Sequence, residues 1–413
     1  MMPPLEIAGR CTRVLQNFDQ AGALLVSDLT NIRWLTGFTG SNGWALLGHN
    51  DIVLVTDGRY GDQAEALLVS DLTNIRWLTG FTGSNGWALL GRDEIVVVTD
   101  GRYGDQATAQ LAEAGVEARV VVGLGGAAIL EALAGEVAAH ESVGFEAAHV
   151  SYEQFQRYQA AFKTSLVPLT GIVEAERRSK DAGEIARMAE ACRIADVALS
   201  EVYQPGMLEG RTEAAVRNQL EIRMRELGAE GPSYETIVAT GPINASRPHH
   251  RPTDAIIESG HTVIIDVGAL YDGYHSDMTR TFFVGGATSQ QREMYDVVLS
   301  AQCAGVAAVE AGITTSEVDA VCRGAITEAG FGDWFTHGTG HGVGLLIHED
   351  PFIMRTGDLK LQVGDVVTVE PGVYRDGFGG IRVEDLVVVT DNGCRVLTAS
   401  PKDSPCPPSP PMT

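Results

Sequence analysis

The chain has 413 residues, of which 44% are hydrophobic and 20% are charged, and it carries a formal net charge of −24 at pH 7. Its length suits two domains, and its composition is that of a globular protein rather than a disordered one. Because so acidic a surface repels nucleic acid and anionic membranes, we expect no partner of either kind.

The start of the chain and its apolar runs indicate a cytoplasmic protein. Residues 1–6 lack the order of basic and then apolar residues that a signal peptide has. The most apolar stretch, residues 120–139, is interrupted by Glu131 and Glu136, so it does not predict a membrane span. The six cysteines are scattered, which is typical of reduced thiols in a cytosolic protein.

The first half of the chain contains a near-identical tandem duplication, residues 23–64 and 66–107. The two copies differ only at four pairs of positions, His49/Arg92, Asn50/Asp93, Asp51/Glu94 and Leu54/Val97. Each copy predicts a strand, a polar turn and two further strands. Two such units cannot occupy one place in a sheet. We therefore expect that one copy is redundant to the fold, and that either the sheet is extended or one copy is extruded as an insertion.

The residues after the duplication continue an alternation of helices and strands. Helices are predicted over 107–114 and 125–139, and strands over 118–122 and 142–145. We therefore predict an N-terminal α/β domain over residues 1–172. The charge-rich run that follows, residues 173–183, is predicted to be a linker.

The second half, residues 184–400, is predicted to contain the same series of elements twice. Apolar residues at helical spacing from Ile185 to Val202 predict a helix, and Thr212 is a candidate N-cap for a second helix. The remaining predictions are strands over 236–239, 262–268 and 274–284, helices over 289–311 and 315–330, and strands over 344–347, 366–370 and 381–389. This order indicates two related halves with a site between them. The proline-rich residues 401–413 predict a disordered tail.

Two acidic residues flank a predicted hairpin. Asp266 ends the apolar run Val-Ile-Ile, and Asp277 lies on the far side of a turn placed at Tyr271 and Asp272. Both aspartates are equally far from that turn, so we expect them to face one another. Two carboxylates at that spacing repel each other unless a proton or a cation lies between them.

A second predicted hairpin repeats this arrangement with glutamates. Glu370 and Glu384 are equidistant from Gly377, and a glycine-rich segment with two histidines, residues 337–344, precedes them. Four carboxylates and an imidazole form a ligand set for two divalent ions. The excess of oxygen ligands favours Mn²⁺, with Co²⁺ and Zn²⁺ as alternatives. A single residue of this kind is usually structural, whereas the whole set in this order indicates a metal site.

These motifs resemble those of the pita-bread metallopeptidases, in the Xaa-Pro branch that contains aminopeptidase P and prolidase. The resemblance rests on residues 265–268, 274–281, 337–345, 370–374 and 380–385, and it extends over about 180–398. Residues 73–84 and their duplicate, 30–41, resemble the creatinase-type N-terminal domain of the same family. The implied fold is a creatinase-like N-terminal α/β domain followed by a C-terminal pita-bread metallopeptidase domain.

The resemblance assigns the metal ligands one by one. Asp266 would bind one ion, His341 and Glu370 would bind the other, and Asp277 and Glu384 would bridge both. The choice of His341 over the other histidine of its segment rests on the resemblance.

Further residues receive catalytic roles in the same way. His249, favoured over His250, and His348 would orient the scissile carbonyl and stabilise the tetrahedral intermediate. Glu370 would carry a proton to the leaving proline nitrogen. Arg382, two residues before Glu384 on the same strand face, would order the carboxylates.

The implied function is that of an Xaa-Pro aminopeptidase, which hydrolyses the bond before a proline in second position by means of a hydroxide shared by two metal ions. Three alternatives stay open: an Xaa-Pro dipeptidase (prolidase), a non-catalytic pita-bread binding protein, and a creatinase-like hydrolase without metal. We also expect a homodimer. The chain departs from the family at Leu346, where an acidic residue is frequent, and in its duplicated N-terminal segment.

Overall fold

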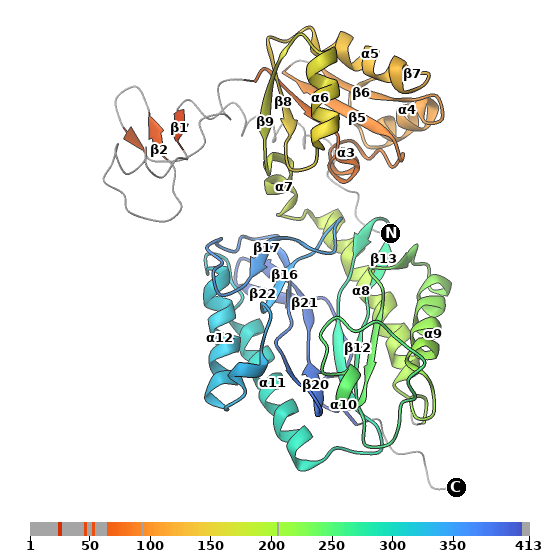
Figure 1. Cartoon of the computed structure of the whole chain (residues 1–413), viewed down its shortest axis with the longest axis vertical. Helices are drawn as coiled ribbons and strands as arrows, with labels where there is room; N and C mark the ends of the chain where they lie inside the picture. The colour runs from red at the N-terminus through yellow and green to blue at the C-terminus, as the bar shows by residue number, and fades with distance from the viewer. Residues whose placement is uncertain are drawn as a thin grey trace. The chain divides into compact units, whose positions relative to one another are not determined.

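The computed structural model describes residues 64–92, 94–204 and 206–406, together with the backbone of three short strands nearer the start of the chain. The chain divides into two compact units between Arg177 and Arg178 (Figure 1). Among the described residues, no helix is both long and apolar enough to cross a membrane. The five cysteines in this part of the chain are all free.

The first unit is built on a six-stranded sheet with the strand order β7-β6-β5-β4-β8-β9. Its strands are β4 (Ala66–Val69), β5 (Gly86–Gly91), β6 (Ile95–Asp100), β7 (Arg119–Gly123), β8 (Ser142–Glu146) and β9 (Ser165–Leu169). Its helices are α3 (Leu72–Thr79), α4 (Gly104–Glu113), α5 (Gly126–Val137), α6 (Tyr152–Ala161) and α7 (Ile172–Arg177). The helices and strands predicted after the duplication are thus confirmed as α4, β7, α5 and β8.

The two copies of the duplication have different places in the structure. The second copy supplies β4, α3, β5 and β6 of the six-stranded sheet, with β8 beside β4 and β7 beside β6. The first copy contributes β1 (Leu24–Val26), β2 (Ala45–Leu47) and β3 (Ile52–Val53), which form a separate three-stranded sheet. The register is the same in both, since Leu24 pairs with Leu47 as Leu67 pairs with Leu90. The six-stranded sheet is therefore not extended by the first copy.

The boundary between the two units falls within the predicted linker, residues 173–183, but much of that segment is folded into the units. Helix α7 occupies its first half, and Arg177 donates a hydrogen bond to Asn74 within the first unit at 2.5 Å. In the second unit, Arg178 and Lys180 are buried in ion pairs with Asp365 and Glu349, at 2.5 and 2.7 Å. The cations of this charge-rich run are therefore buried with polar or acidic partners.

The second unit contains two pairs of helices, each packed on strands. The helices are α8 (Ala182–Val202), α9 (Glu213–Glu226), α11 (Ser289–Ala308) and α12 (Thr315–Glu328), with the short α10 (Gly241–Asn244). Figure 1 shows the strands lying between the α8/α9 pair and the α11/α12 pair. One hydrophobic core joins α8 and α9 to the strands before residue 285, and another joins α11 and α12 to the later strands.

The helix starts follow from local sequence. Thr212 caps α9 by accepting a hydrogen bond from the Ala215 amide, as predicted. Capping boxes, in which two side chains satisfy each other's backbone amides, start the other three long helices: Asp181 with Glu184, Thr288 with Gln291, and Thr314 with Glu317.

The strands of the second unit form four small sheets, with the orders β10-β13-β14, β11-β12-β15, β17-β16-β18-β21-β22 and β19-β20. The strands before α11 are β10 (Gly231–Pro232), β11 (Ile237–Thr240), β12 (Thr262–Asp266), β13 (Ala269–Tyr271), β14 (Tyr274–His275) and β15 (Thr279–Phe283). The later ones are β16 (Gly340–Gly342), β17 (Glu349–Ile353), β18 (Val366–Val369), β19 (Gly372–Arg375), β20 (Gly379–Arg382), β21 (Asp385–Thr390) and β22 (Gly393–Val396).

Two predictions for this unit are wrong. Residues 344–347, predicted as a strand, lie in the bend between β16 and β17. The predicted disordered tail is packed as far as Cys406: Lys402 forms an ion pair with Asp385, and the Phe283 amide donates to the Pro405 carbonyl at 2.9 Å. Residues 407–413 lie outside the described part of the chain.

Candidate metal centre

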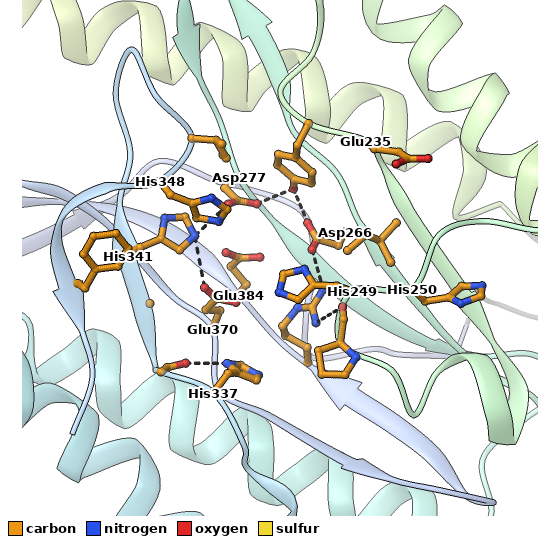
Figure 2. A pocket seen from close by; sticks show the side chains of 18 of the residues that line it. Glu235, His249, His250, Asp266, Asp277, His337, His341, His348, Glu370 and Glu384 are labelled. Carbon is orange, nitrogen blue, oxygen red and sulfur yellow. Dashed lines mark hydrogen bonds and ion pairs between the residues drawn. The ribbon is translucent and has the colours of Figure 1, made fainter. Parts of the chain in front are cut away.

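One cavity of the second unit, of about 440 Å³, is lined by all five predicted metal ligands. They are Asp266, Asp277, His341, Glu370 and Glu384. The predicted catalytic residues His249, His348 and Arg382 line the same cavity. Figure 2 shows the carboxylates and the imidazole of His341 converging from strands of both halves. The fold therefore brings together every residue that the sequence singled out.

The hairpin with the two aspartates differs from the predicted one in register. Tyr271 pairs with Tyr274, so the turn consists of Asp272 and Gly273, which both have positive φ (46° and 74°). This backbone is the type I′ turn that Asp-Gly favours. Asp266 therefore pairs with Thr279. Asp277, two residues earlier on the same strand face, is its diagonal rather than its direct neighbour.

The register predicted for the two glutamates is confirmed. Val369 pairs with Asp385 in one ladder and Gly372 pairs with Arg382 in the next, so both ladders are symmetric about Gly377. Glu370 and Glu384 occupy the corresponding positions between the two ladders. Their amides bond outside the hairpin, to the carbonyls of Thr339 and Thr279.

His341 projects from β16 toward three carboxylates. Its Nε2 lies 3.5 Å from Asp277 Oδ2 and 3.4 Å from Glu370 Oε1, while its Nδ1 lies 3.0 Å from the Gly342 carbonyl. A carbonyl accepts only, so Nδ1 carries the proton and Nε2 presents a lone pair to the cavity. Asp277, His341 and Glu384 each offer one donor atom within 4.8 Å of the others.

The electrostatics of the cavity fit a bound cation. Burial raises the pKa of Asp277 and Glu384 well above the ordinary values, and the neighbouring carboxylates raise both further. Burial also raises the pKa of Glu370, to about 7. Carboxylates held this close in a buried site need protons or cations between them. A set of carboxylate oxygens and one imidazole nitrogen suits hard or borderline divalent ions.

Two side chains fix the orientation of Asp266. Arg382 Nη2 lies 2.6 Å from Asp266 Oδ2, and the same guanidinium donates to Thr279 Oγ1 and the Tyr374 hydroxyl at 2.9 and 2.7 Å. The Tyr234 hydroxyl is hydrogen-bonded to both aspartates, 2.5 Å from Asp277 Oδ1. Sequence reasoning missed Tyr234, because a lone tyrosine outside any spaced pattern gives no signal.

The histidines near the candidate metal ligands differ in the groups that they contact. His250 Nε2 is 2.8 Å from the buried carboxylate of Glu213, whereas His249 faces the cavity (Figure 2). The ring of His348 lies 4.3 Å from that of His341 between centroids. His337 also lines the cavity, with Nε2 3.1 Å from the Tyr374 hydroxyl. Sequence reasoning left His337 without a role, although its glycine-rich segment was a signal.

Comparison with known proteins decides the family. The model of metallopeptidase family M24 matches residues 186–391. The chain is 41% identical over 391 residues to the uncharacterized peptidase YqhT of Bacillus subtilis, covering 94% of this chain and 96% of that protein. The chain belongs to metallopeptidase family M24. As an M24 metallopeptidase it is an enzyme, and enzymes of this family use divalent metal ions.

Solved structures of the M24 family match both units. An Xaa-Pro dipeptidase from Bacillus anthracis is 33% identical, with a TM-score of 0.82 over 97% of this chain and 99% of that chain. An X-Pro aminopeptidase from Thermotoga maritima is 33% identical, with a TM-score of 0.74 over 82% and 94%. The creatinase/prolidase N-terminal domain model matches twice, at residues 10–67 and 62–179. The creatinase N-terminal domain and the pita-bread domain are thus both established.

Proposed function

We propose that this M24 enzyme is an Xaa-Pro aminopeptidase, which releases the N-terminal residue of peptides that carry proline second. The supporting observation is the single cavity that contains five candidate metal donors beside His249, His337 and His348. The substrate class is supported by the likeness to the T. maritima X-Pro aminopeptidase. An Xaa-Pro dipeptidase is the second candidate, which the likeness to the B. anthracis enzyme favours.

Asp266 is proposed to hold one divalent ion and His341 and Glu370 the other, with Asp277 and Glu384 between them. Mn²⁺ is the proposed ion, because four of the five donors are carboxylates. Bound in this way, two divalent ions supply a nucleophile at neutral pH and polarise the scissile carbonyl. Arg382 and Tyr234 hold Asp266 in the orientation that this requires.

The remaining residues act on the peptide. His249 and His348 orient the scissile carbonyl and donate to its oxygen as negative charge develops there. Glu370 is proposed to carry a proton to the leaving proline nitrogen. We further propose that the enzyme is a cytoplasmic homodimer. Light scattering would then give twice the chain mass of 44.0 kDa.

The decisive assay starts from metal-free protein. Mn²⁺, Co²⁺ or Zn²⁺ is added back separately, and each form is given an Xaa-Pro dipeptide, an Xaa-Pro-Yaa tripeptide and an Xaa-Ala control. We expect cleavage of the tripeptide, strongest with Mn²⁺, and none of the control. Cleavage of the dipeptide alone would establish the prolidase instead. Activity without any metal would indicate the creatinase-like hydrolase, and no cleavage under any condition would leave the non-catalytic binding protein.

A variant at Asp277 tests its proposed place between the ions. Asp277→Asn keeps the shape of the side chain and removes one negative charge from a crowded buried site, so we expect loss of activity without loss of folding. Peptide cleavage and urea unfolding are measured on the same samples. Asp376→Asn, at an exposed aspartate in the β19–β20 turn, is the matched control. Unchanged turnover in Asp277→Asn would refute the assignment.

A further inference from the structure

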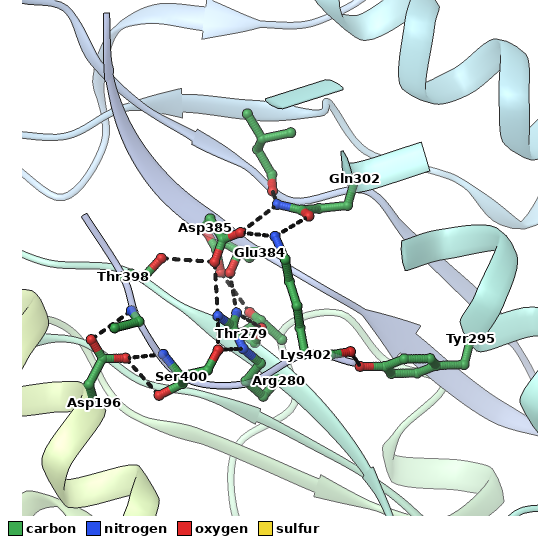
Figure 3. Close-up of polar contacts among 12 residues, drawn as sticks. Asp196, Thr279, Arg280, Tyr295, Gln302, Glu384, Asp385, Thr398, Ser400 and Lys402 are labelled. Carbon is green, nitrogen blue, oxygen red and sulfur yellow. Dashed lines mark hydrogen bonds and ion pairs between the residues drawn. The ribbon is translucent and has the colours of Figure 1, made fainter. Parts of the chain in front are cut away.

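The C-terminal segment, residues 398–402, lies directly behind the metal centre. Glu384 and Asp385 are consecutive and almost completely buried. Neighbouring residues of an extended strand point to opposite faces. Glu384 accordingly lines the cavity, whereas Asp385 points away from it into a separate polar cluster (Figure 3).

The carboxylate of Asp385 is surrounded by donors, and two of them come from the C-terminal segment. Arg280 Nη2 and Gln302 Nε2 lie at 2.8 and 3.0 Å from it. Thr398 Oγ1 donates at 2.8 Å, and the Lys402 ammonium forms an ion pair with the other oxygen. Lys402 also donates to Gln302 Oε1 at 2.8 Å. The buried negative charge is thus balanced by two cations, and one of them belongs to the end of the chain.

The segment that carries Lys402 is itself fixed at several points. Asp196 on α8 accepts hydrogen bonds from the Ala399 and Ser400 amides, both at 2.8 Å. Arg280 donates to the Ser400 carbonyl at 2.7 Å, and the Tyr295 hydroxyl on α11 donates to the Lys402 carbonyl at 2.5 Å. Helices from both halves of the unit therefore hold this segment in place.

A short path joins this cluster to the proposed ligand. Arg280, beside Asp385, also donates to the Glu384 carbonyl and to the Thr279 carbonyl. The Thr279 hydroxyl donates to Glu384 Oε2 at 2.7 Å. A change in the balance of charge around Asp385 can thus shift the backbone and the carboxylate of Glu384 together.

We infer that Lys402 is a positioning residue for the metal centre, which acts through Asp385 and Arg280 on Glu384. The inference rests on the proposed metal site. Without Lys402, Asp385 Oδ2 would lose its cation, and Arg280, which already bonds the other oxygen, would be drawn toward Oδ2 and away from the Glu384 carbonyl. Because loss of a group that orients a metal ligand typically costs 10–100-fold in metal affinity, we expect an effect of about that size.

The test measures the binding of Mn²⁺ to metal-free protein by calorimetry. Lys402→Met should weaken the binding of Mn²⁺ by about 10-fold or more and lower kcat, with little change in KM. Lys402→Arg keeps the positive charge and should recover part of the affinity. Lys163→Met, at an exposed lysine of the first unit, and a chain that ends after Cys406 should both bind Mn²⁺ as the wild type does.

The outcomes separate the inference from the proposed function. If the wild type binds no Mn²⁺, the proposed metal site fails. If the wild type binds Mn²⁺ and Lys402→Met binds it equally well, the inference is overturned, even where urea unfolding shows a loss of stability. Should Lys402→Met not fold, Thr398→Val removes one hydroxyl from Asp385 and should weaken Mn²⁺ binding in the same direction. Unchanged affinity in that folded variant also contradicts the inference.

Discussion

The adjacent histidines His249 and His250 differ in what their rings contact. His250 is buried against Glu213, whose carboxylate also accepts hydrogen bonds from the Thr240 and Thr253 amides at 2.7 and 2.9 Å. These hydrogen bonds fix residues 240–253, the segment that places His249 at the cavity. His250 therefore stabilises the fold, whereas the ring of His249 is available to a substrate.

This difference predicts opposite consequences of two alanine substitutions. His249→Ala should lower kcat about 100-fold with little change in stability, because the proposed donor to the developing negative charge is lost. His250→Ala should cost about 2 kcal/mol of unfolding free energy, because it removes a partner of a fully buried carboxylate. Peptide cleavage and urea unfolding of both variants check this. The reverse pattern would assign the catalytic role to His250.

His337 gives a prediction for acid stability. Burial, together with the nearby Arg382, lowers the pKa of His337 to about 4, against about 6.5 in the unfolded chain. Between about pH 4 and pH 6.5, the unfolded chain binds a proton at His337 that the folded chain does not bind. The free energy of unfolding, which is fully present above pH 6.5, therefore decreases as the pH falls through this range. Between pH 7 and pH 5, the wild type should lose about 1–2 kcal/mol more unfolding free energy than His337→Gln. Urea unfolding at both pH values measures the difference, and equal losses would contradict it.

At the scale of elements, β16 can lie against β18 only because the residue before His341 is a glycine, Gly340. A Cβ built on Gly340 would lie 2.0 Å from the Thr368 carbonyl oxygen, far inside contact distance. The strand that presents His341 therefore depends on the absence of a side chain one residue earlier.

Gly340→Ala should accordingly displace β16 from β18 and move His341 with it. We expect a loss of about 2 kcal/mol of unfolding free energy, as for other forced overpacking, together with weaker Mn²⁺ binding. Gly135→Ala, in the interior of α5 where a Cβ would meet nothing within 4 Å, is the matched control. That control should be more stable by about 0.5–1 kcal/mol, since alanine is the better helix former. Wild-type Mn²⁺ affinity in Gly340→Ala would refute this account of β16.

For the whole molecule, the duplication predicts that one copy is dispensable. Removal of residues 23–65 deletes the first copy and leaves every strand of the six-stranded sheet in place. The shortened protein should fold and cleave peptides as the full chain does. Unfolding measurements and peptide cleavage test this, and loss of folding would show that both copies are structural.

Removal of residues 66–108 instead is the matched experiment, because it leaves the first copy to form the same strands. That protein should also fold, with somewhat lower stability. Leu54 would then take the place of Val97, which is fully buried, and an added methylene in a packed core costs about 1–3 kcal/mol. Equal stability of the two shortened proteins would mean that this core position tolerates leucine.

The sequence by itself determined the features that depend on neighbouring residues. Apolar spacing located the helix that contains Ile185 and Val202, and the cap Thr212 located the start of the next one. The symmetry about Gly377 predicted the register that aligns Glu370 with Glu384. The register of Asp266 and Asp277 was mispredicted by two residues. The Asp272-Gly273 pair was the signal that could have corrected it, because a two-residue turn with positive φ favours this dipeptide.

Tertiary structure alone decided the features that join distant parts of the chain. Tyr234 contacts Asp277 from a segment 43 residues away, and Lys402 reaches Asp385 from a tail whose prolines predicted disorder. Likewise, Arg178 and Lys180 of the predicted linker are buried against Asp365 and Glu349. Hydrophobic and capping patterns are local, whereas the pairing of a buried charge depends on which strands the fold places beside it. The sequence therefore predicted the candidate metal ligands, and the fold decided which residues hold them in position.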